Sequence, residues 1–368
     1  MEAGTKQCLR LLFWETTIKC NLTCAHCRRL ESNETANKDL DTAEGKNLLE
    51  QLSVIGQRQH FMPVIVFSGG EPLCRPDLFE LIEYAQHLSI TPALATNGTL
   101  IDTEIARRIK NSGIMRVSIS LDGATAEMHN RLRQLKGSFE QSIAGIKYLA
   151  AEKVPFQINI TLTKHNAGQI TQMYDLAESL GAVALHIFVL VPVGCGQALA
   201  ETDMLLPQEY ERKMVEICEL EKWARLHIKV TCGPHYERVR RQQLSNEERV
   251  VSAHNPGHTA SHGHHGASRG CLAGMGVLFV GHQGDVFPCG YLPINCGNIL
   301  KTPLAEIWYG SKELATMRDS GCLEGKCGVC GYRNVCGGCR GRAYAATGNY
   351  MAQEPFCSYT PPQTDKVI

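Results

Sequence analysis

Short apolar runs alternate with amphipathic segments along the first two thirds of the chain. The runs are rich in Val, Ile, Leu and Phe, as buried parallel strands are, and the segments between them carry apolar side chains at helical spacing. The predicted strands are residues 9–18, 63–67, 92–95, 115–121, 155–162 and 182–191. The predicted helices are residues 42–57, 76–88, 102–111, 138–151, 166–180 and 207–225. Six strand–helix units in a row predict an α/β fold with a parallel sheet, and six units rather than eight predict a partial barrel open on one side.

A polar motif follows each of the first four predicted strands. The motifs are three cysteines at CxxxCxxC spacing after the first strand, then Gly69-Gly70-Glu71, Thr96-Asn97-Gly98 and Asp122. Parallel α/β folds collect their chemistry at the carboxyl ends of the strands. We therefore expect these four motifs to meet at one edge of the sheet.

The first motif, Cys20, Cys24 and Cys27, has the spacing of a cluster ligand set. Three thiolates can hold three irons of a cubane, and one iron then keeps open positions for a chelating co-substrate. A zinc knuckle or buried structural thiols are the alternatives. His26 is a poor fourth zinc ligand because it lies between two ligands in a tight loop.

Composition excludes several classes of partner. The chain has 368 residues with 37 basic and 37 acidic side chains, so its charge gives no reason to expect nucleic acid. Neither a signal peptide nor an apolar run of membrane-spanning length is visible, and we expect a cytoplasmic protein. Seventeen cysteines without a secretion signal point to metal or cluster ligation rather than disulfides. Exposed iron is damaged by oxygen, so we expect an anaerobic setting.

Three regions follow from these patterns. Residues 1–229 form the predicted barrel, residues 230–270 a linker, and residues 271–368 a cysteine-rich module. The linker contains five histidines within residues 254–265 and reads as a mobile loop, with metal binding as the alternative.

The cysteine-rich module has a spacing of its own. It runs Cys271-x12-Gly284-x4-Cys289, Cys327-x2-Cys330-x5-Cys336-x2-Cys339, then Cys357. Together, CxxxCxxC and Gly-Gly-Glu resemble the radical S-adenosylmethionine (SAM) enzymes, and this module resembles their SPASM extension. The resemblance implies a partial (β/α)6 radical SAM barrel with a C-terminal SPASM module. One departure is that two residues, not the usual three, precede Cys339.

The resemblance also implies SAM-binding residues. Gly69 and Gly70 would hydrogen-bond the methionyl amine, Glu71 and Asn97 would lie at the same edge, Ser120 or Asp122 would meet the ribose, and Arg133 would pair with the carboxylate. A tight turn at the glycines, or solvated charges at Arg131 and Arg133, are the alternatives.

By the same resemblance the module holds two auxiliary clusters, giving three 4Fe–4S clusters in all. The first complete set is Cys327, Cys330, Cys336 and Cys357. The second is Cys271, Cys289 and Cys339, with Cys296, Cys322, Asp285 or the substrate as fourth ligand. Two zinc sites are the alternative. The remaining, isolated cysteines are interpreted as small buried hydrophobic residues: Cys8, Cys74, Cys195, Cys218 and Cys232. Two of them, Cys195 and Cys232, lie near predicted site loops.

Nearly the whole chain resembles the heme synthases of the siroheme-dependent pathway, most clearly in residues 11–17, 192–196, 231–236, 289–293 and 336–348. That resemblance implies oxidative decarboxylation of two propionates of iron-coproporphyrin III to vinyl groups, with ferredoxin or flavodoxin as reductant. Arg238, Arg240 or Arg342 would lie near the propionates. The alternative is that Arg238, Arg240 and Arg241 form a solvated helix face.

Rival hypotheses are a SPASM peptide maturase, the deacetylase of the same pathway, and a non-catalytic cluster or heme carrier. Only eight residues precede Leu9, which leaves no peptide-binding domain ahead of the first strand and argues against a maturase. Gly69-Gly70-Glu71 and Thr96-Asn97-Gly98 have no purpose in a carrier.

Overall fold

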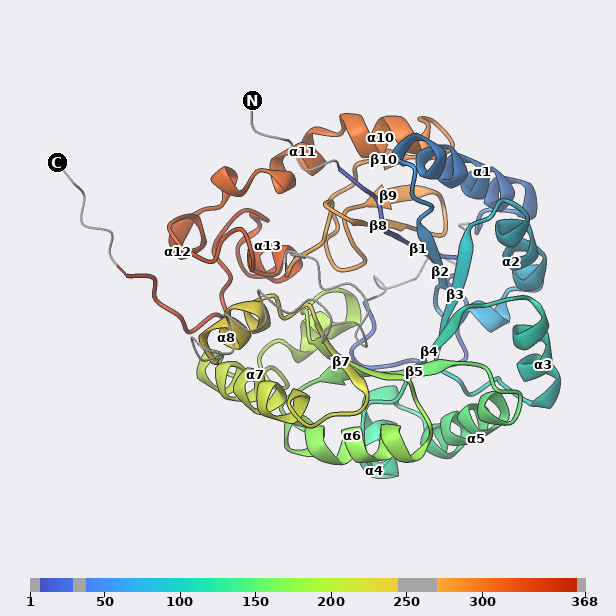
Figure 1. The fold of residues 1–368 in the computed structure, drawn as a ribbon, viewed down its shortest axis with the longest axis horizontal. Coiled ribbons are helices and arrows are strands. Elements are labelled where there is room, and N and C mark those ends of the chain that lie inside the picture. The colour runs from blue at the N-terminus through green and yellow to red at the C-terminus, as the bar shows by residue number, and fades with distance from the viewer. Residues whose placement is uncertain (1–6, 29–37, 244–269, 363–368) are drawn as a thin grey trace, which may run out of the picture.

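One curved sheet organises the chain in the computed structural model, which describes residues 7–28, 38–243 and 270–362. Within them the sheet has ten strands in the order β10-β9-β8-β1-β2-β3-β4-β5-β6-β7, and all neighbours from β8 to β7 are parallel (Figure 1). The strands are β1 (Leu11–Glu15), β2 (Val64–Ser68), β3 (Thr91–Thr96), β4 (Arg116–Ser120), β5 (Phe156–Leu162), β6 (Ala184–Val189), β7 (His227–Thr231), β8 (Val277–Val280), β9 (Asp285–Phe287) and β10 (Gly297–Asn298).

Helices cover the outer face of this sheet, as Figure 1 shows for α1 to α6. Helix α1 illustrates the cause: Asp41 and Glu44 form a capping box at its start, and Leu48, Leu49 and Leu52 are buried on one side. The helices are α1 (Thr42–Gln59), α2 (Leu78–His87), α3 (Thr103–Asn111), α4 (Ala126–Arg133), α5 (Ser138–Ala151), α6 (Ile170–Ser179), α7 (Pro207–Glu221), α8 (His235–Gln243), α10 (Leu304–Gly310), α11 (Lys312–Arg318), α12 (Gly325–Gly328) and α13 (Arg340–Thr347).

Strand alternation separates an apolar outer face from a polar interior between β4 and β7. Ile119, Ile158 and Ile187 belong to the buried core. The positions between them point the other way, and sheet register places four polar ones side by side across β4, β5, β6 and β7: Ser120, Asn159, His186 and Lys229. We call these four residues the interior polar row.

The C-terminal module continues the same sheet. Strand β8 pairs in parallel with β1, with Leu11 opposite Val277, and β9 returns antiparallel beside β8. Strand β1 therefore has one neighbour from the barrel and one from the cysteine-rich module.

The predicted partial barrel is confirmed, and β7 and β8 extend its sheet beyond the six predicted strands. Strand β7 crosses the boundary predicted at residue 229, and α8 is a helix inside the segment predicted as a linker. The histidine-rich residues 254–265 lie outside the described residues. Among the helices that the structure describes, none combines the length and the apolar character needed to cross a membrane.

Candidate functional site

The three cysteines of the first motif lie in the loop that follows β1, here called the cluster loop (residues 20–27). Burial, together with negative charge on Glu71, Cys24 and Cys27, raises the pKa of Cys20 to about 11, although the amide of Leu22 opposes this rise by donating to Cys20 Sγ at 3.4 Å. The three thiols thus lie within electrostatic reach of one another. Cationic iron would remove their protons and relieve this cost.

Gly69 and Gly70 pack directly against the chain that leads into the cluster loop. The Gly70 amide donates to Thr17 O at 2.7 Å, and the next amide donates to Lys19 O at 2.8 Å. A Cβ atom on Gly70 would lie 2.4 Å from Lys19 O. Glycine is required here because two backbones approach without room for a side chain.

Glu71 is completely buried and holds the loop after β3 in place. Its Oε1 accepts from Thr96 Oγ1 at 2.7 Å and from the Leu73 amide at 3.2 Å, and its Oε2 accepts from the Asn97 amide at 2.8 Å. Asn97 Nδ2 then donates to Asn21 Oδ1 in the cluster loop at 2.9 Å. Glu71 therefore connects the second motif to the first and third.

Asp122 and Arg133 form a buried ion pair beneath the cluster loop. Arg133 Nη2 lies 2.6 Å from Asp122 Oδ2, and Arg133 Nη1 donates to Cys24 Sγ at 3.6 Å. His26 Nε2 lies 3.4 Å from the same Asp122 oxygen, and the Asp122 amide donates to His129 Nδ1 at 3.1 Å. Burial alone would raise the pKa of Asp122, but Arg133, His26 and His129 lower it on balance. The aspartate is thus held as an anion that orients the loop.

Most of the predicted SAM-binding residues therefore meet at one edge of the sheet, beside the cluster loop. In this structure Glu71, Asp122 and Arg133 bond to protein groups. Ser120 belongs to the interior polar row. Within the described residues, His26 Nδ1, His129 Nε2 and Arg133 Nε are buried beside the loop without a hydrogen-bond partner.

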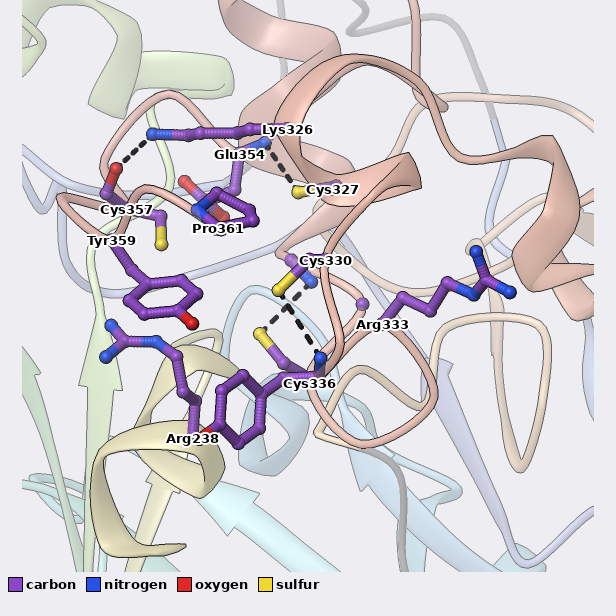
Figure 2. Close-up of a pocket in the computed structure, with 13 residues that line it drawn as sticks. Arg238, Lys326, Cys327, Cys330, Arg333, Cys336, Glu354, Cys357, Tyr359 and Pro361 are labelled. Carbon is purple, nitrogen blue, oxygen red and sulfur yellow. Dashed lines mark hydrogen bonds between the residues drawn. The ribbon is translucent and has the colours of Figure 1, made fainter. Parts of the chain in front are cut away.

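The first predicted auxiliary set lines a pocket in the C-terminal module. Figure 2 shows the sulfur atoms of its four cysteines directed toward the same space. Three of these sulfurs accept a backbone hydrogen bond: Cys327 from Glu354 at 3.3 Å, Cys330 from Tyr332 at 3.4 Å, and Cys336 from Gly338 at 3.4 Å. The fourth member, Cys357, is within electrostatic reach of Cys327. Amide donors around sulfur suit thiolates that ligate a cluster.

The second predicted auxiliary set also comes together. Charges on Cys271, Cys289 and Cys339 influence one another, and Cys232 lies beside Cys339 with a hydrogen bond between their side chains. In the described part of the chain, no three His, Cys, Asp or Glu side chains converge closely enough for a single metal ion.

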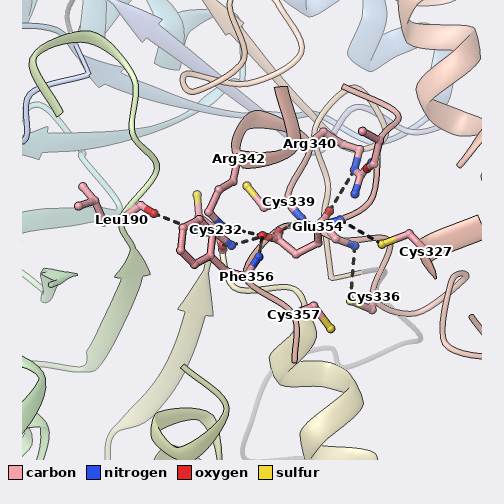
Figure 3. A network of polar contacts seen from close by, with 12 residues as sticks. Leu190, Cys232, Cys327, Cys336, Cys339, Arg340, Arg342, Glu354, Phe356 and Cys357 are labelled. Carbon is pink, nitrogen blue, oxygen red and sulfur yellow. Dashed lines mark hydrogen bonds and ion pairs between the residues drawn. The ribbon is translucent and has the colours of Figure 1, made fainter. Parts of the chain in front are cut away.

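A buried ion pair connects the two auxiliary sets, as Figure 3 shows. Arg342 Nε lies 2.8 Å from Glu354 Oε1, and Glu354 Oε2 accepts from the Cys339 amide at 2.7 Å. The Glu354 amide faces Cys327 of the other set. Arg342 also donates to Leu190 O at 3.1 Å and Cys232 O at 2.7 Å, so it ties the module to the barrel.

Tyr291 lies within electrostatic reach of both the cluster loop and the second auxiliary set, and the sequence pattern did not identify it as a site residue. Its pKa is raised by burial and by charge on Cys232, Cys289 and Cys27, while Arg28 opposes this. The run Cys289-Gly-Tyr was visible in the sequence, but the distance to Cys27 depends on the fold.

The arginines predicted near substrate carboxylates are already paired. Arg238 makes two bonds to Glu211, at 2.8 and 2.6 Å, and Arg240 lies 3.3 Å from Glu237. Lys229 of the interior polar row is exposed, and it has no ion pair among the described residues. Desolvation by the surrounding protein lowers the pKa of Lys229, and burial together with the Lys229 charge lowers the pKa of His186. Lys229 is therefore a better candidate to meet an anion.

Comparisons with known proteins agree with this geometry. Residues 14–177 match the radical SAM superfamily, and residues 271–340 match the SPASM iron–sulfur cluster-binding domain. An AdoMet-dependent heme synthase of Methanosarcina barkeri is 44% identical over 96% of this chain and 97% of its own length. The corresponding protein of Oleidesulfovibrio alaskensis is 42% identical over 98% of this chain and 90% of its own length.

Among solved structures, Streptococcus suis SuiB bound to precursor peptide SuiA has a TM-score of 0.72 at 17% identity, covering 96% of this chain and 76% of SuiB. At that identity the likeness concerns the fold alone. The SPASM match and the radical SAM match support an enzyme that uses SAM and iron–sulfur clusters. The chain belongs to the radical SAM superfamily and, within it, to the family of the AdoMet-dependent heme synthases.

Proposed function

We propose that this protein converts two propionate side chains of iron-coproporphyrin III into vinyl groups and so produces heme b. The observation that carries the proposal is the 44% identity to a heme synthase over 96% of the chain. The structure supports it with cysteine sets from both ends of the chain and an accessible cation, Lys229, in the barrel interior.

The residues present fit the implied cofactors. Cys20, Cys24 and Cys27 would hold the first cluster, and the two C-terminal sets would hold two more, giving three in total. When bound, the first cluster supplies an electron that cleaves SAM to methionine and a 5'-deoxyadenosyl radical.

The chain's own residues would bind and orient SAM. The amides of Gly70 and Glu71 already donate to the backbone, so the carbonyl oxygens of Gly69 and Gly70 are the groups available to accept from the methionyl ammonium. Asn97 and Ser120 would face the nucleoside part. Arg133 holds Cys24 and Asp122 in place and keeps a buried Nε–H without a partner in the described residues. That group would lie near the SAM carboxylate.

The substrate chemistry is balanced with one SAM and one electron per propionate. Removal of a hydrogen atom from the carbon next to the macrocycle yields a substrate radical and 5'-deoxyadenosine. Loss of carbon dioxide then leaves the vinyl group and releases one electron, which an auxiliary cluster would accept. Ferredoxin or flavodoxin would supply the electron that begins each cycle.

The test is anaerobic incubation of the reconstituted protein with SAM, a strong reductant and iron-coproporphyrin III. Mass spectrometry should detect a mono-vinyl intermediate and then heme b, with loss of carbon dioxide and two hydrogens per propionate. The Cys24→Ala variant should cleave no SAM and form neither product. SAM cleavage by the unaltered protein without change in porphyrin mass would contradict the proposal and favour a peptide maturase or the deacetylase.

A further inference from the structure

A fourth cysteine, Cys232, accompanies the three predicted ligands of the second auxiliary set. Its thiol and that of Cys339 share a hydrogen bond, and its charge interacts with Cys289. Cys271 and Cys289 each interact with Cys339 in the same way. Figure 3 shows the Cys232 and Cys339 side chains together beside Arg342. Residue 232 is thus far from residues 271–339 in sequence and adjacent to them in space.

The other groups considered as fourth ligand have different neighbours. Cys296 Sγ lies 3.6 Å from Ile294 O, and the exposed Cys322 Sγ lies 3.5 Å from Asp319 Oδ2. The Asp285 carboxylate accepts from Asn295 and Asn298, each at 3.1 Å. None of these contacts involves the second set.

The backbone at Cys232 is held in an unusual conformation. Its φ angle is 57°, in the left-handed region that costs a non-glycine residue free energy and persists where the surroundings fix it. The residue follows β7 directly, and Arg342 fixes its carbonyl oxygen at 2.7 Å. The strand and the Arg342–Glu354 pair together hold Cys232 at the second set.

We propose that Cys232 is the fourth protein ligand of the auxiliary cluster held by Cys271, Cys289 and Cys339. The inference rests on the proposed function only in requiring a cluster at this site. Four cysteine ligands leave no iron open, so substrate would not be held on this cluster. The cluster would instead act in electron transfer, and Arg342 would offset part of its negative charge.

The experiment isolates this cluster within the full-length chain. A background protein carries Cys20→Ala, Cys24→Ala and Cys27→Ala, which remove the first cluster, and Cys327→Ala and Cys330→Ala, which remove the other auxiliary cluster. Into it we introduce Cys232→Ala or, as matched control, Cys296→Ala. After anaerobic reconstitution, iron, sulfide and electron paramagnetic resonance spectra are measured for each protein, with and without added imidazole.

The background protein and its Cys296→Ala version should hold about four irons, remain spectroscopically silent when oxidised and ignore imidazole. Cys232→Ala should lose one iron and give a three-iron signal when oxidised, or bind imidazole at the exposed iron. Cys232→Ser provides a second measurement if the alanine variant fails to fold, and it should shift the midpoint potential of the cluster.

The proposal would be overturned if Cys232→Ala and Cys296→Ala gave identical spectra and iron content, or if Cys232→Ser left the midpoint potential of the cluster unchanged. Imidazole binding by the background protein, or a disulfide bond between Cys232 and Cys339, would also overturn it. A background protein without iron would refute a cluster at this site altogether. None of these measurements uses porphyrin. A failure of the heme synthase assay can therefore be told apart from a failure of this proposal.

Discussion

Two carboxylates of the sequence motifs hold other parts of the site in place through contacts with protein groups. Glu71 and Asp122 are fully buried carboxylates: Glu71 accepts from the Asn97 amide, and Asp122 accepts from the Thr161 amide and pairs with Arg133. Buried charges of this kind are stable only when they are paired and hydrogen-bonded. Their residue types could be predicted to matter, but their exact partners could not, because Thr96, Thr161 and Arg133 come from other elements.

Lys229 offers a test of substrate binding at the level of one side chain. Lys229→Met should raise KM for iron-coproporphyrin III by about 10-fold or more, because a hydrogen bond to a charged group is worth about 1.5–3 kcal/mol. Cleavage of SAM in the absence of porphyrin should be unaffected. Steady-state kinetics with porphyrin mass detection measures both quantities.

Lys110→Met on the exposed surface of α3 is the control and should leave KM unchanged. An unaltered KM in Lys229→Met would exclude this lysine from propionate binding. Lys229→Arg should restore affinity in part, since it retains the positive charge.

At the level of elements, the close packing of Gly70 on residues 18 and 19 fixes the cluster loop relative to β2. Gly70→Ala should place a methyl group 2.4 Å from Lys19 O and force the two segments apart. We expect a loss of about 1–3 kcal/mol in the free energy of unfolding, as overpacking in a rigid site produces. Iron retained by Cys20, Cys24 and Cys27 should fall as well.

Urea unfolding and iron analysis of anaerobically prepared protein test this prediction. Gly168→Ala is the matched control because nothing lies within 4 Å of a Cβ atom there. A Gly70→Ala protein as stable and as rich in iron as the control would refute the role assigned to the glycine.

Most elements of the barrel could be predicted because their strands are buried on both faces or their helices carry an apolar stripe. Helix α4 was missed since it is mainly polar, yet it buries His129 and Arg133 beside the site. Strand β7 was missed because His227 and Lys229 alternate with apolar residues and face the barrel interior. Both misses arise where a polar interior replaces the usual apolar pattern.

At the scale of the whole molecule, the Arg342–Glu354 pair joins the barrel, the module and both auxiliary sets. Arg342→Met leaves a buried carboxylate without its partner, and we expect a loss of about 3–5 kcal/mol in unfolding free energy. Adding Glu354→Gln should recover part of that loss, because the unpaired charge is then removed. Chemical unfolding of Arg342→Met, Glu354→Gln and the double variant gives the three free energies of a double-mutant cycle.

Additive losses in that cycle would mean that the two side chains stabilise the protein independently. Lys301→Met, an exposed lysine in the same module, is the control and should change stability by less than about 0.5 kcal/mol. The association of barrel and module could not be predicted from sequence, since Arg342 reaches Leu190 and Cys232 only in the folded chain.

The pairing of β1 with both β2 and β8 has a consequence for the order of assembly during synthesis. Strand β2 leaves the ribosome soon after β1, whereas β8 begins only at Val277. One edge of β1 therefore lacks its sheet neighbour until most of the chain has been made, and the loop with Cys20, Cys24 and Cys27 adjoins that strand. The sheet around the strand that leads into the cluster loop is therefore completed only after Val277 and the residues that follow it have been made.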